Sequence, residues 1–321
     1  MTYMHKLSAR LALCHRLPVM LLTSILLGCT GEVTGGLAPN GQPGPPPPPG
    51  PNTFPPADIA VFDYASGVPT TVSCGGSVPW DGNGSCTNRH RYNASAAALE
   101  NVWTTSASLD DYSPVWQPFG TSLTEGYFAW RFLQQGWMDG SSSNVKWLSR
   151  FGHTSGSNRG VFYSSNGNGS IGWYFDDNIA SGTCSAYLGL NQNGPPPSPP
   201  PGYASYGNPS DGAVHVIELR WWRSASEMYA QFWYDGIPIV QPAGPAWCAD
   251  WYWVNPPHTL GPSWRAGNPG EPSILVLSKG STATINRSGF TEQMSGVPFA
   301  TAGSQFLYKF AVSTTRIGPN F

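Results

Sequence analysis

The sequence has few charged residues. Asp, Glu, Lys and Arg together make up 11% of its 321 residues, and the formal net charge is −2. The chain carries no basic stripe, so its composition gives no support for nucleic-acid binding. Aromatic residues make up 13%, with 14 Trp, and Gly (38) and Pro (32) are abundant. This composition is typical of an all-β protein with many turns and argues against a helical or disordered chain.

Residues 1–28 are predicted to be an export signal. An apolar run at 17–27 follows several basic residues and is too short to span a bilayer comfortably. The run leads into Leu-Leu-Gly-Cys at 26–29, which resembles the lipobox of bacterial lipoproteins. The resemblance implies cleavage before Cys29 and acylation of this cysteine. Because Thr30 follows in place of Asp, it also implies the outer membrane or the cell surface. The alternative is an ordinary signal peptide with a chance cysteine.

Residues 29–53 are predicted to be the lipidated cysteine and a tether rich in proline and glycine. The segment has no apolar periodicity, and five consecutive prolines at 45–49 favour polyproline II. At about 3.1 Å per residue, such a spacer holds a domain several nanometres from the membrane. The membrane is therefore expected to be contacted through the lipid anchor only. The globular domain is expected to comprise residues 54–321.

The chain contains six cysteines, none of them in a Cys-x-x-Cys pair, which argues against a zinc site. Cys14 lies in the signal and Cys29 is the lipidation site. The other four form an even set in an oxidising compartment and predict two disulfides: Cys74, Cys86, Cys184 and Cys248. Three pairings are possible. Cys74–Cys86 would close a short loop, which favours that pairing and leaves Cys184–Cys248.

Residues 213–235 have a clear strand pattern. Two runs of alternating side chains flank a short polar turn, which predicts a β-hairpin. In the first run, one face carries His215, Ile217, Leu219 and Trp221, and the other carries Val216, Glu218, Arg220 and Trp222. Both faces mix aromatic and polar side chains. This mixture favours a sheet with one face lining a wet, aromatic groove.

Further strands are separated by turn signals such as Asn-Gly and Asp-Gly. The expected strands are Ile59–Tyr64, Tyr127–Leu133, Val145–Phe151, Gly160–Ser164, Ser170–Phe175, Val214–Trp222, Met228–Tyr234, Ile274–Leu277 and Gln305–Thr314. Residues 94–102, with their run of alanines, are expected to form a short turn of helix. Many strands joined by long loops predict an all-β fold, a two-sheet antiparallel β-sandwich of the jelly-roll kind.

Three stretches along the domain resemble a known family. They are residues 126–139 with 144–152, the hairpin region 215–239, and residues 307–319, which end in Ser-Thr-x-x-Ile-Gly-Pro. In this order they resemble the concanavalin A-like lectin/glucanase superfamily, and more narrowly its bacterial polysaccharide-lyase-like jelly-roll members. The resemblance implies a concanavalin A-like sandwich and a polysaccharide as the partner.

The lyase members imply cleavage of a uronic acid by β-elimination. That reaction needs a cation to neutralise the carboxylate, a base for the neighbouring proton and an acid for the leaving oxygen. The candidate cations are Arg131, Arg150 and Arg220, and the candidate base and acid are His215 with Tyr229 or Tyr234. The alternatives are solvated or ion-paired arginines, a hydrogen-bonded structural histidine, and an ion pair between Glu218 and Arg220.

A retaining glucanase is disfavoured. Such enzymes of this superfamily carry Glu-x-Asp-x-x-Glu on one strand, which holds the nucleophile and the acid at the retaining separation. None of the seven glutamates of this chain has that spacing.

Flat aromatic side chains can stack on sugar rings, so several are candidate ligand contacts. The candidates are Trp130, Trp147, Trp233, Tyr234, Trp251 and Trp253. The last two lie in the aromatic loop 247–253, for which the alternatives are an exposed binding platform and a cluster packed over the sandwich end. No metal site and no cofactor are predicted. A structural calcium ion at Asp110-Asp111 or Asp176-Asp177 is conceivable, although Asx turns are the commoner explanation.

Three functions agree with these observations. The first is a surface-anchored domain that binds polysaccharide, favoured by the aromatic content. The second is a polysaccharide lyase, favoured by the family resemblance. The third is a structural component of a cell-surface or extracellular assembly.

Overall fold

The computed structural model describes much of the chain from Phe54 onward. The described residues are 54–68, 73–74, 78–79, 90–103, 115–136, 145–152, 159–164, 170–176, 186–191, 206, 208–240, 244–245, 251–254, 271–277, 284–290 and 302–321. They all belong to one unit, Pro45–Phe321. The predicted signal, Cys29 and the tether lie outside the described residues. Among the residues described, no helix has the length and apolar character needed to cross a membrane.

The larger of two antiparallel sheets has 11 strands. Along its main path, in spatial order, lie β15 (Gly244–Pro245), β16 (Trp251–Val254), β17 (Ile274–Leu277), β13 (Met228–Tyr234), β12 (Asp211–Arg223), β7 (Glu125–Gln135), β19 (Gly303–Ser313), β5 (Ala98–Trp103) and β4 (His90–Asn93). Two further strands pair off this path, β1 (Ala60–Asp63) with β19 and β14 (Ile237–Pro238) with β13. The predicted hairpin is confirmed as β12 and β13, which pair in antiparallel register.

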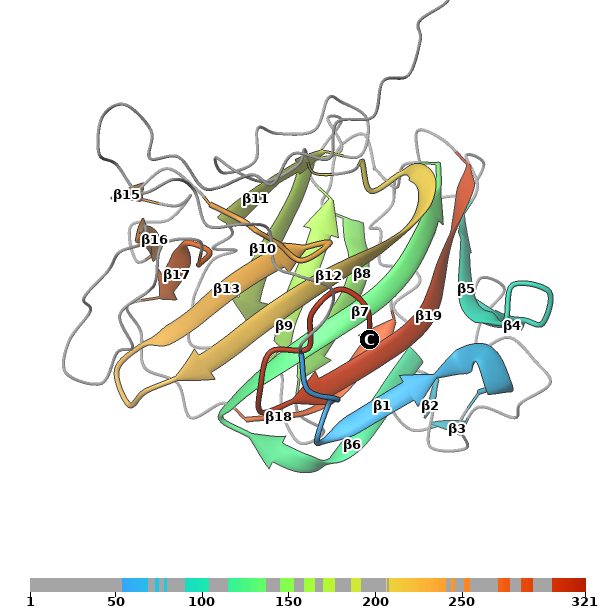
Figure 1. Ribbon diagram of the computed structural model, residues 1–321, viewed down its shortest axis with the longest axis horizontal. Coiled ribbons are helices and arrows are strands. Elements are labelled where there is room, and N and C mark those ends of the chain that lie inside the picture. The colour runs from blue at the N-terminus through green and yellow to red at the C-terminus, as the bar shows by residue number, and fades with distance from the viewer. Residues whose placement is uncertain are drawn as a thin grey trace, which may run out of the picture. The chain divides into compact units, whose positions relative to one another are not determined.

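The smaller sheet has eight strands. In spatial order they are β11 (Ala186–Asn191), β10 (Ser170–Asp176), β9 (Arg159–Ser164), β8 (Val145–Gly152), β18 (Ile285–Phe290), β6 (Val115–Leu123), β2 (Ser73–Cys74) and β3 (Val78–Pro79). A short 3-10 helix, η1 (Tyr64–Ser66), follows β1. The chain alternates between the sheets, since β5 and β7 lie in the larger and β6 and β8 in the smaller (Figure 1).

The two sheets pack face to face around one aromatic core. Trp130 of β7 meets Phe162 of β9 edge-on, with ring centroids 5.4 Å apart. Trp173 of β10 meets Phe232 of β13 at 5.5 Å. We call the side of the larger sheet that faces the smaller one its inner face, and the opposite side its outer face. The molecule is therefore a jelly-roll β-sandwich of antiparallel sheets, as predicted from the sequence.

Each expected strand coincides with an observed one, but the expected helical turn at 94–102 is wrong. Ala98–Trp103 is strand β5, paired with β4 on one side and β19 on the other. Leu99 and Trp103 enter the core, while Glu100 on the opposite side accepts a hydrogen bond from Arg91. Pairing with two neighbours outweighs the helical preference of the alanines, as often happens to local propensities in sheets.

The disulfide prediction concerns residues that are mostly not described. Cys74 lies in β2, and its side chain is outside the described residues, as are Cys86, Cys184 and Cys248. The two disulfides and their pairing therefore stay predictions. Among the described residues, no group of three or more His, Cys, Asp or Glu side chains is placed to hold a metal ion. The calcium expectation at 110–111 lies outside the described residues; at 176–177, Asp176 ends β10 with its side chain outside them, and Asp177 is not described.

Candidate functional site

His215 lies on the inner face at the end of the sandwich, where β12 begins. The side chain is 5% exposed, and its ring stacks on that of Tyr234 with centroids 5.1 Å apart. Its Nδ1 lies 2.7 Å from Asp235 Oδ2, and its Nε2 lies 3.0 Å from Asp211 Oδ1. Only the doubly protonated ring can donate to both carboxylates. Burial alone would lower the pKa of His215, but the two aspartates outweigh burial and raise it.

The clamped His215 has no nitrogen left to act as a base. Both ring nitrogens lie within hydrogen-bond distance of a carboxylate, and the same Asp235 side chain accepts the backbone N–H of Val216 at 2.7 Å. The alternative of a hydrogen-bonded structural histidine describes this geometry, and the prediction of a catalytic base does not.

The other predicted catalytic residues are not assembled around His215. Arg220 and Tyr229 lie on the outer face, so the sheet separates them from the histidine. The Tyr229 hydroxyl donates a hydrogen bond to Glu227 Oε2. Burial raises the pKa of Tyr229, and this hydrogen bond raises it further. Arg131 is exposed on β7. Arg150 belongs to β8 of the other sheet, with its side chain outside the described residues.

Several predicted sugar-stacking aromatics are core residues. Trp130 and Trp147 are fully buried and donate their indole N–H groups to Ser288 Oγ (3.1 Å) and Gln134 Oε1 (2.8 Å). Burial also removes Trp233, Tyr234 and Trp253 from the surface. Trp251 lies in β16, and its side chain is outside the described residues. The other rings are buried and are not open to a sugar. Both faces of their strands are aromatic, and sequence alternation does not say which face is covered. For Trp253 of the loop 247–253, burial agrees with the packed-cluster alternative.

The middle of the outer face is covered by the C-terminal segment. Glu218 of β12 is 1% exposed, and its carboxylate accepts the backbone N–H groups of Ile317 (2.7 Å) and Gly318 (3.2 Å). Burial raises the pKa of Glu218, against the opposing effect of Arg316, whose Nε lies 3.5 Å from Oε2. Figure 1 shows the C-terminal segment crossing in front of β7 and β12. The predicted groove is therefore closed at this point.

The N-terminal end of the domain joins this covering segment. The guanidinium of Arg316 lies 4.7 Å from the ring centroids of both Phe54 and Trp233. The carboxylate of Asp58 accepts hydrogen bonds from the backbone N–H of Thr314 (2.7 Å) and from the hydroxyls of Thr314 and Ser313. We call residues 54–58 and 313–319 with Glu218 and Trp233 the terminal clasp.

Next to the terminal clasp, the outer face carries a partly open group that we call the Arg220 cluster, comprising Glu125, Tyr127, Arg220, Trp222 and Gln231. The Arg220 guanidinium lies 4.4 Å from the Trp222 ring centroid and 5.5 Å from that of Tyr127. Its Nη2 donates to Glu125 Oε1 at 2.6 Å, and its Nη1 donates to Gln231 Oε1 at 3.4 Å. The register explains this arrangement, since Arg220 stands opposite Tyr127 on β7 and opposite Gln231 on β13.

The Arg220 cluster presents both flat rings and polar groups to solvent. Trp222 and Tyr127 are half-buried, and the Glu125 side chain is 52% exposed. Burial raises the pKa of Tyr127, so its hydroxyl stays protonated near neutral pH. The expected ion pair between Glu218 and Arg220 is wrong, because each binds a different partner. Trp222 and Tyr127 were not among the aromatics predicted to contact a ligand, although alternation placed Trp222 on one face with Arg220.

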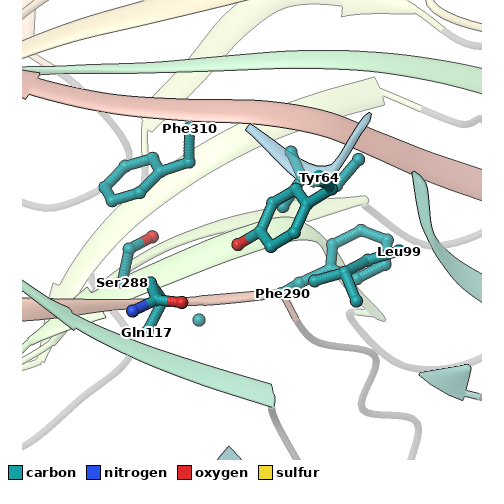
Figure 2. Close-up of a pocket in the computed structure, with 8 residues that line it drawn as sticks. Tyr64, Leu99, Gln117, Ser288, Phe290 and Phe310 are labelled. Atoms are coloured by element: carbon teal, nitrogen blue, oxygen red, sulfur yellow. The ribbon is translucent and has the colours of Figure 1, made fainter. Parts of the chain in front are cut away.

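A small internal cavity lies between the sheets, away from this cluster. Its lining includes Tyr64, Gln117, Ser288 and Phe310 (Figure 2). The cavity measures about 10 Å³, which is room for about one water molecule. It is far too small for a saccharide, so it is not a candidate ligand site.

No family model matches the chain, and no curated protein matches it in sequence. Among solved structures, similar chains include a marine alginate lyase from Zobellia galactanivorans, with 9% identity, 79% of this chain and 100% of that one covered, and a TM-score of 0.38. An endo-β-1,3(4)-glucanase has 12% identity over 84% of this chain and 98% of its own, with a TM-score of 0.40. A Lotus tetragonolobus seed lectin has 7% identity over 80% and 98%, with a TM-score of 0.36.

These proteins belong to the lyase, glucanase and lectin classes named by the sequence resemblance. All three TM-scores lie below 0.5. The strand order, the register and the aromatic core of this chain define its jelly-roll fold.

Proposed function

We propose that this domain binds polysaccharide through the Arg220 cluster on the outer face of the larger sheet. One observation carries the proposal: a half-buried arginine is held against Trp222 and Tyr127, and both rings are partly open to solvent. Binding sites for small polar ligands combine such aromatic surface with a few fixed polar groups. The rings offer stacking area, and Arg220, Glu125 and Gln231 offer donors and acceptors for sugar hydroxyls.

Binding without cleavage is the better supported reading. A β-eliminating lyase needs its cation at the carboxylate and its base at the proton of the adjacent ring carbon, so both must reach one sugar ring from the same side of the sheet. Here Arg220 and the clamped His215 lie on opposite faces of one sheet. No observation among the described residues favours the third reading, a structural component of an assembly.

The proposal includes the location of the protein. Acylation at Cys29 would hold it at the outer membrane or the cell surface, and residues 30–53 would act as the tether. Phe54, where the domain begins, is fixed against Arg316 in the terminal clasp. Metabolic labelling with a fatty acid tests the anchor. Label should enter the wild-type chain and be absent from the Cys29→Ser variant, and equal labelling of both would contradict it.

Affinity electrophoresis tests the binding site. The full chain in mild detergent would be run through gels containing alginate, glucuronan, a glycosaminoglycan or a neutral β-glucan. At least one polysaccharide should retard the wild type, and Trp222→Ala should weaken that binding about tenfold, the effect of losing about 1.4 kcal/mol of stacking. Tyr308→Ala is the matched control, because Tyr308 is a half-buried aromatic of the same sheet outside the cluster. Equal retardation of the Trp222 and Tyr308 variants would contradict the proposal.

A further inference from the structure

We propose that three glutamates around the Arg220 cluster, Glu125, Glu227 and Glu271, determine which saccharide the cluster accepts. We call these three residues the acidic rim. The rim selects against saccharides that carry carboxylate or sulfate groups, and it favours a saccharide that carries amino groups. The inference rests on the proposed function and adds the chemical class of the ligand.

The positive charge of Arg220 is already balanced within the protein. Its Nη2 donates to Glu125 Oε1 at 2.6 Å, and its Nη1 donates to Gln231 Oε1 at 3.4 Å. The guanidinium also lies against the rings of Trp222 and Tyr127, and only 17% of the Arg220 side chain is exposed. The Glu125 side chain is 52% exposed. Of this ion pair, a ligand therefore meets mainly the carboxylate.

Glu271 borders the cluster on the side of β13. The carbonyl of the next residue, Pro272, accepts a hydrogen bond from Gln231 Nε2 at 3.3 Å, which fixes this segment beside the cluster. Glu271 itself is half-buried. Burial is the main reason why the pKa of Tyr127 is raised, and the nearby carboxylate of Glu271 raises it as well. The charge of Glu271 thus reaches one of the two rings of the proposed site.

Glu227 borders the cluster at the turn between β12 and β13. Its Oε2 accepts a hydrogen bond from the hydroxyl of Tyr229. Tyr229 in turn stacks on Trp222, with ring centroids 5.2 Å apart. Glu227 is half-buried. A second carboxylate therefore stands one ring away from the other aromatic side chain of the proposed site.

Within the described part of the chain, no cation balances these two carboxylates. Neither Glu227 nor Glu271 takes part in any ion pair described there. Arg223, the next cation along β12, stands opposite Met228 of the core and so belongs to the inner face. Because the ion pair inside the cluster is neutral, the acidic rim leaves the surroundings of the rings with a net negative charge.

This charge discriminates between classes of saccharide. Placing like charges side by side on binding costs free energy, which is a common way to exclude a wrong ligand. An ammonium group gains instead, both from the carboxylates and from the faces of aromatic rings. The rings of Trp222 and Tyr127 already lie against a guanidinium, so their arrangement suits a cation. A neutral sugar would use the rings and hydrogen bonds alone.

The test measures the affinity of the full chain in mild detergent at low salt for three polymers. Chitosan carries amino groups that are charged at pH 6, β-glucan is neutral, and alginate carries carboxylates. Chitosan should bind most tightly and alginate most weakly. The double variant Glu227→Gln, Glu271→Gln should bind chitosan about fivefold more weakly, the factor that an exposed ion pair contributes to an equilibrium constant. It should bind alginate more tightly and β-glucan with unchanged affinity.

Asp63→Asn is the matched control. Asp63 is another exposed carboxylate of the larger sheet, 47% exposed, but it lies in β1 outside the acidic rim. Its substitution should leave the ratio of the chitosan and alginate affinities unchanged, which separates the rim from a general change in charge. High salt should reduce this ratio for the wild type, because salt screens exposed charges. Thermal unfolding would show that each variant is folded, and Glu271→Gln alone would serve if the double variant is not.

The inference and the proposed function can fail separately. If alginate binds the wild type as tightly as chitosan, the inference is overturned while polysaccharide binding stands. The same conclusion follows if removing the rim charges leaves the ratio of the two affinities unchanged. If neither these three polymers nor those of the electrophoresis panel bind the wild type, both fail.

Discussion

Two neighbouring regions of the outer face differ although they share a strand. The Glu218 carboxylate accepts hydrogen bonds from the backbone of the C-terminal segment, at Ile317 and Gly318, and the residue is 1% exposed. At Arg220, two residues further along the same face, the side chain is 17% exposed and the adjacent rings are only half-buried. The first region is bound to the chain's own C-terminal segment, and the second is where we propose that saccharide binds.

The comparison shows that a polar residue in an aromatic strand is not by itself a sign of function. Glu218 and Arg220 have similar neighbours in the sequence, and what separates them is what lies over each. Substitutions that act on one region should therefore leave the other intact.

Breaking the terminal clasp at its buried charge should cost the most stability. Glu218→Ala would leave Arg316 Nε without its carboxylate and the N–H groups of Ile317 and Gly318 without their acceptor. Removing one partner of a buried charged pair costs about 3–5 kcal/mol. Urea unfolding of this variant should show a loss of that size in the free energy of unfolding.

Glu125→Ala, which removes the exposed carboxylate of the other region, is the control and should lose at most about 1 kcal/mol in the free energy of unfolding. Equal losses would contradict the comparison.

A bulkier residue at Gly318 should also open the clasp. Gly318 has φ +79°, and a Cβ atom there would lie 2.1 Å from Phe54 Cδ2. Strain and overlap together predict a loss of about 2–4 kcal/mol in the free energy of unfolding for Gly318→Ala. Gly120 is the matched control, because it has φ +77° and nothing within 4 Å of the added atom. Gly120→Ala should show the strain alone, so a loss as large as that of Gly318→Ala would exclude a role for Phe54.

The His215 clamp on the inner face should make stability depend on pH. The aspartates raise the folded pKa of His215 above its ordinary value of 6.5, so the imidazolium stabilises the fold fully below about pH 6.5. That contribution is lost as the pH rises through the higher folded pKa. At pH 6, His215→Gln should lose about 1–3 kcal/mol, the contribution of hydrogen bonds to a charged group.

The measurement is chemical unfolding of both chains across pH 6–9. The difference between the wild type and the variant should shrink as the pH rises, which isolates His215 from Glu218, whose raised pKa also makes stability fall with increasing pH. A difference independent of pH would show that His215 is held as the neutral ring.

Sequence alternation predicted the β12–β13 hairpin and the division of its faces, because a strand repeats every two residues. It could not say which face was covered. The closest contacts of Glu218 come from residues 317 and 318, about a hundred positions away, and no spacing rule links them. For the same reason, the sequence did not show that Arg220 pairs with Glu125 and not with Glu218. Glu125 comes close to Arg220 only because β7 pairs with β12.

Local propensity failed where pairing decided the outcome. Residues 98–103 follow a run of alanines that favours a helix, yet they form a strand between β4 and β19. As a strand, they bury Leu99 and Trp103 in the core. The buried aromatics Trp130 and Trp147 could not be told from exposed ones, because both hairpin faces carry rings. The alternation of residues 213–222 did place Trp222 on the same face as Arg220, and this pattern could have predicted that the two side chains lie together.

The Nε–H group of Arg220 is a direct probe of the proposed saccharide binding at the Arg220 cluster. Its signal in the nitrogen-15 spectrum of the full chain in detergent can be assigned by its absence from Arg220→Lys and followed as chitosan or β-glucan oligosaccharides are added. If saccharide binds at the cluster, this signal should shift saturably as a sugar ring packs beside Trp222 and Tyr127, while the Nε–H signal of Arg316 in the terminal clasp should stay unchanged. An unchanged Arg220 signal at saturating oligosaccharide would contradict the proposed binding.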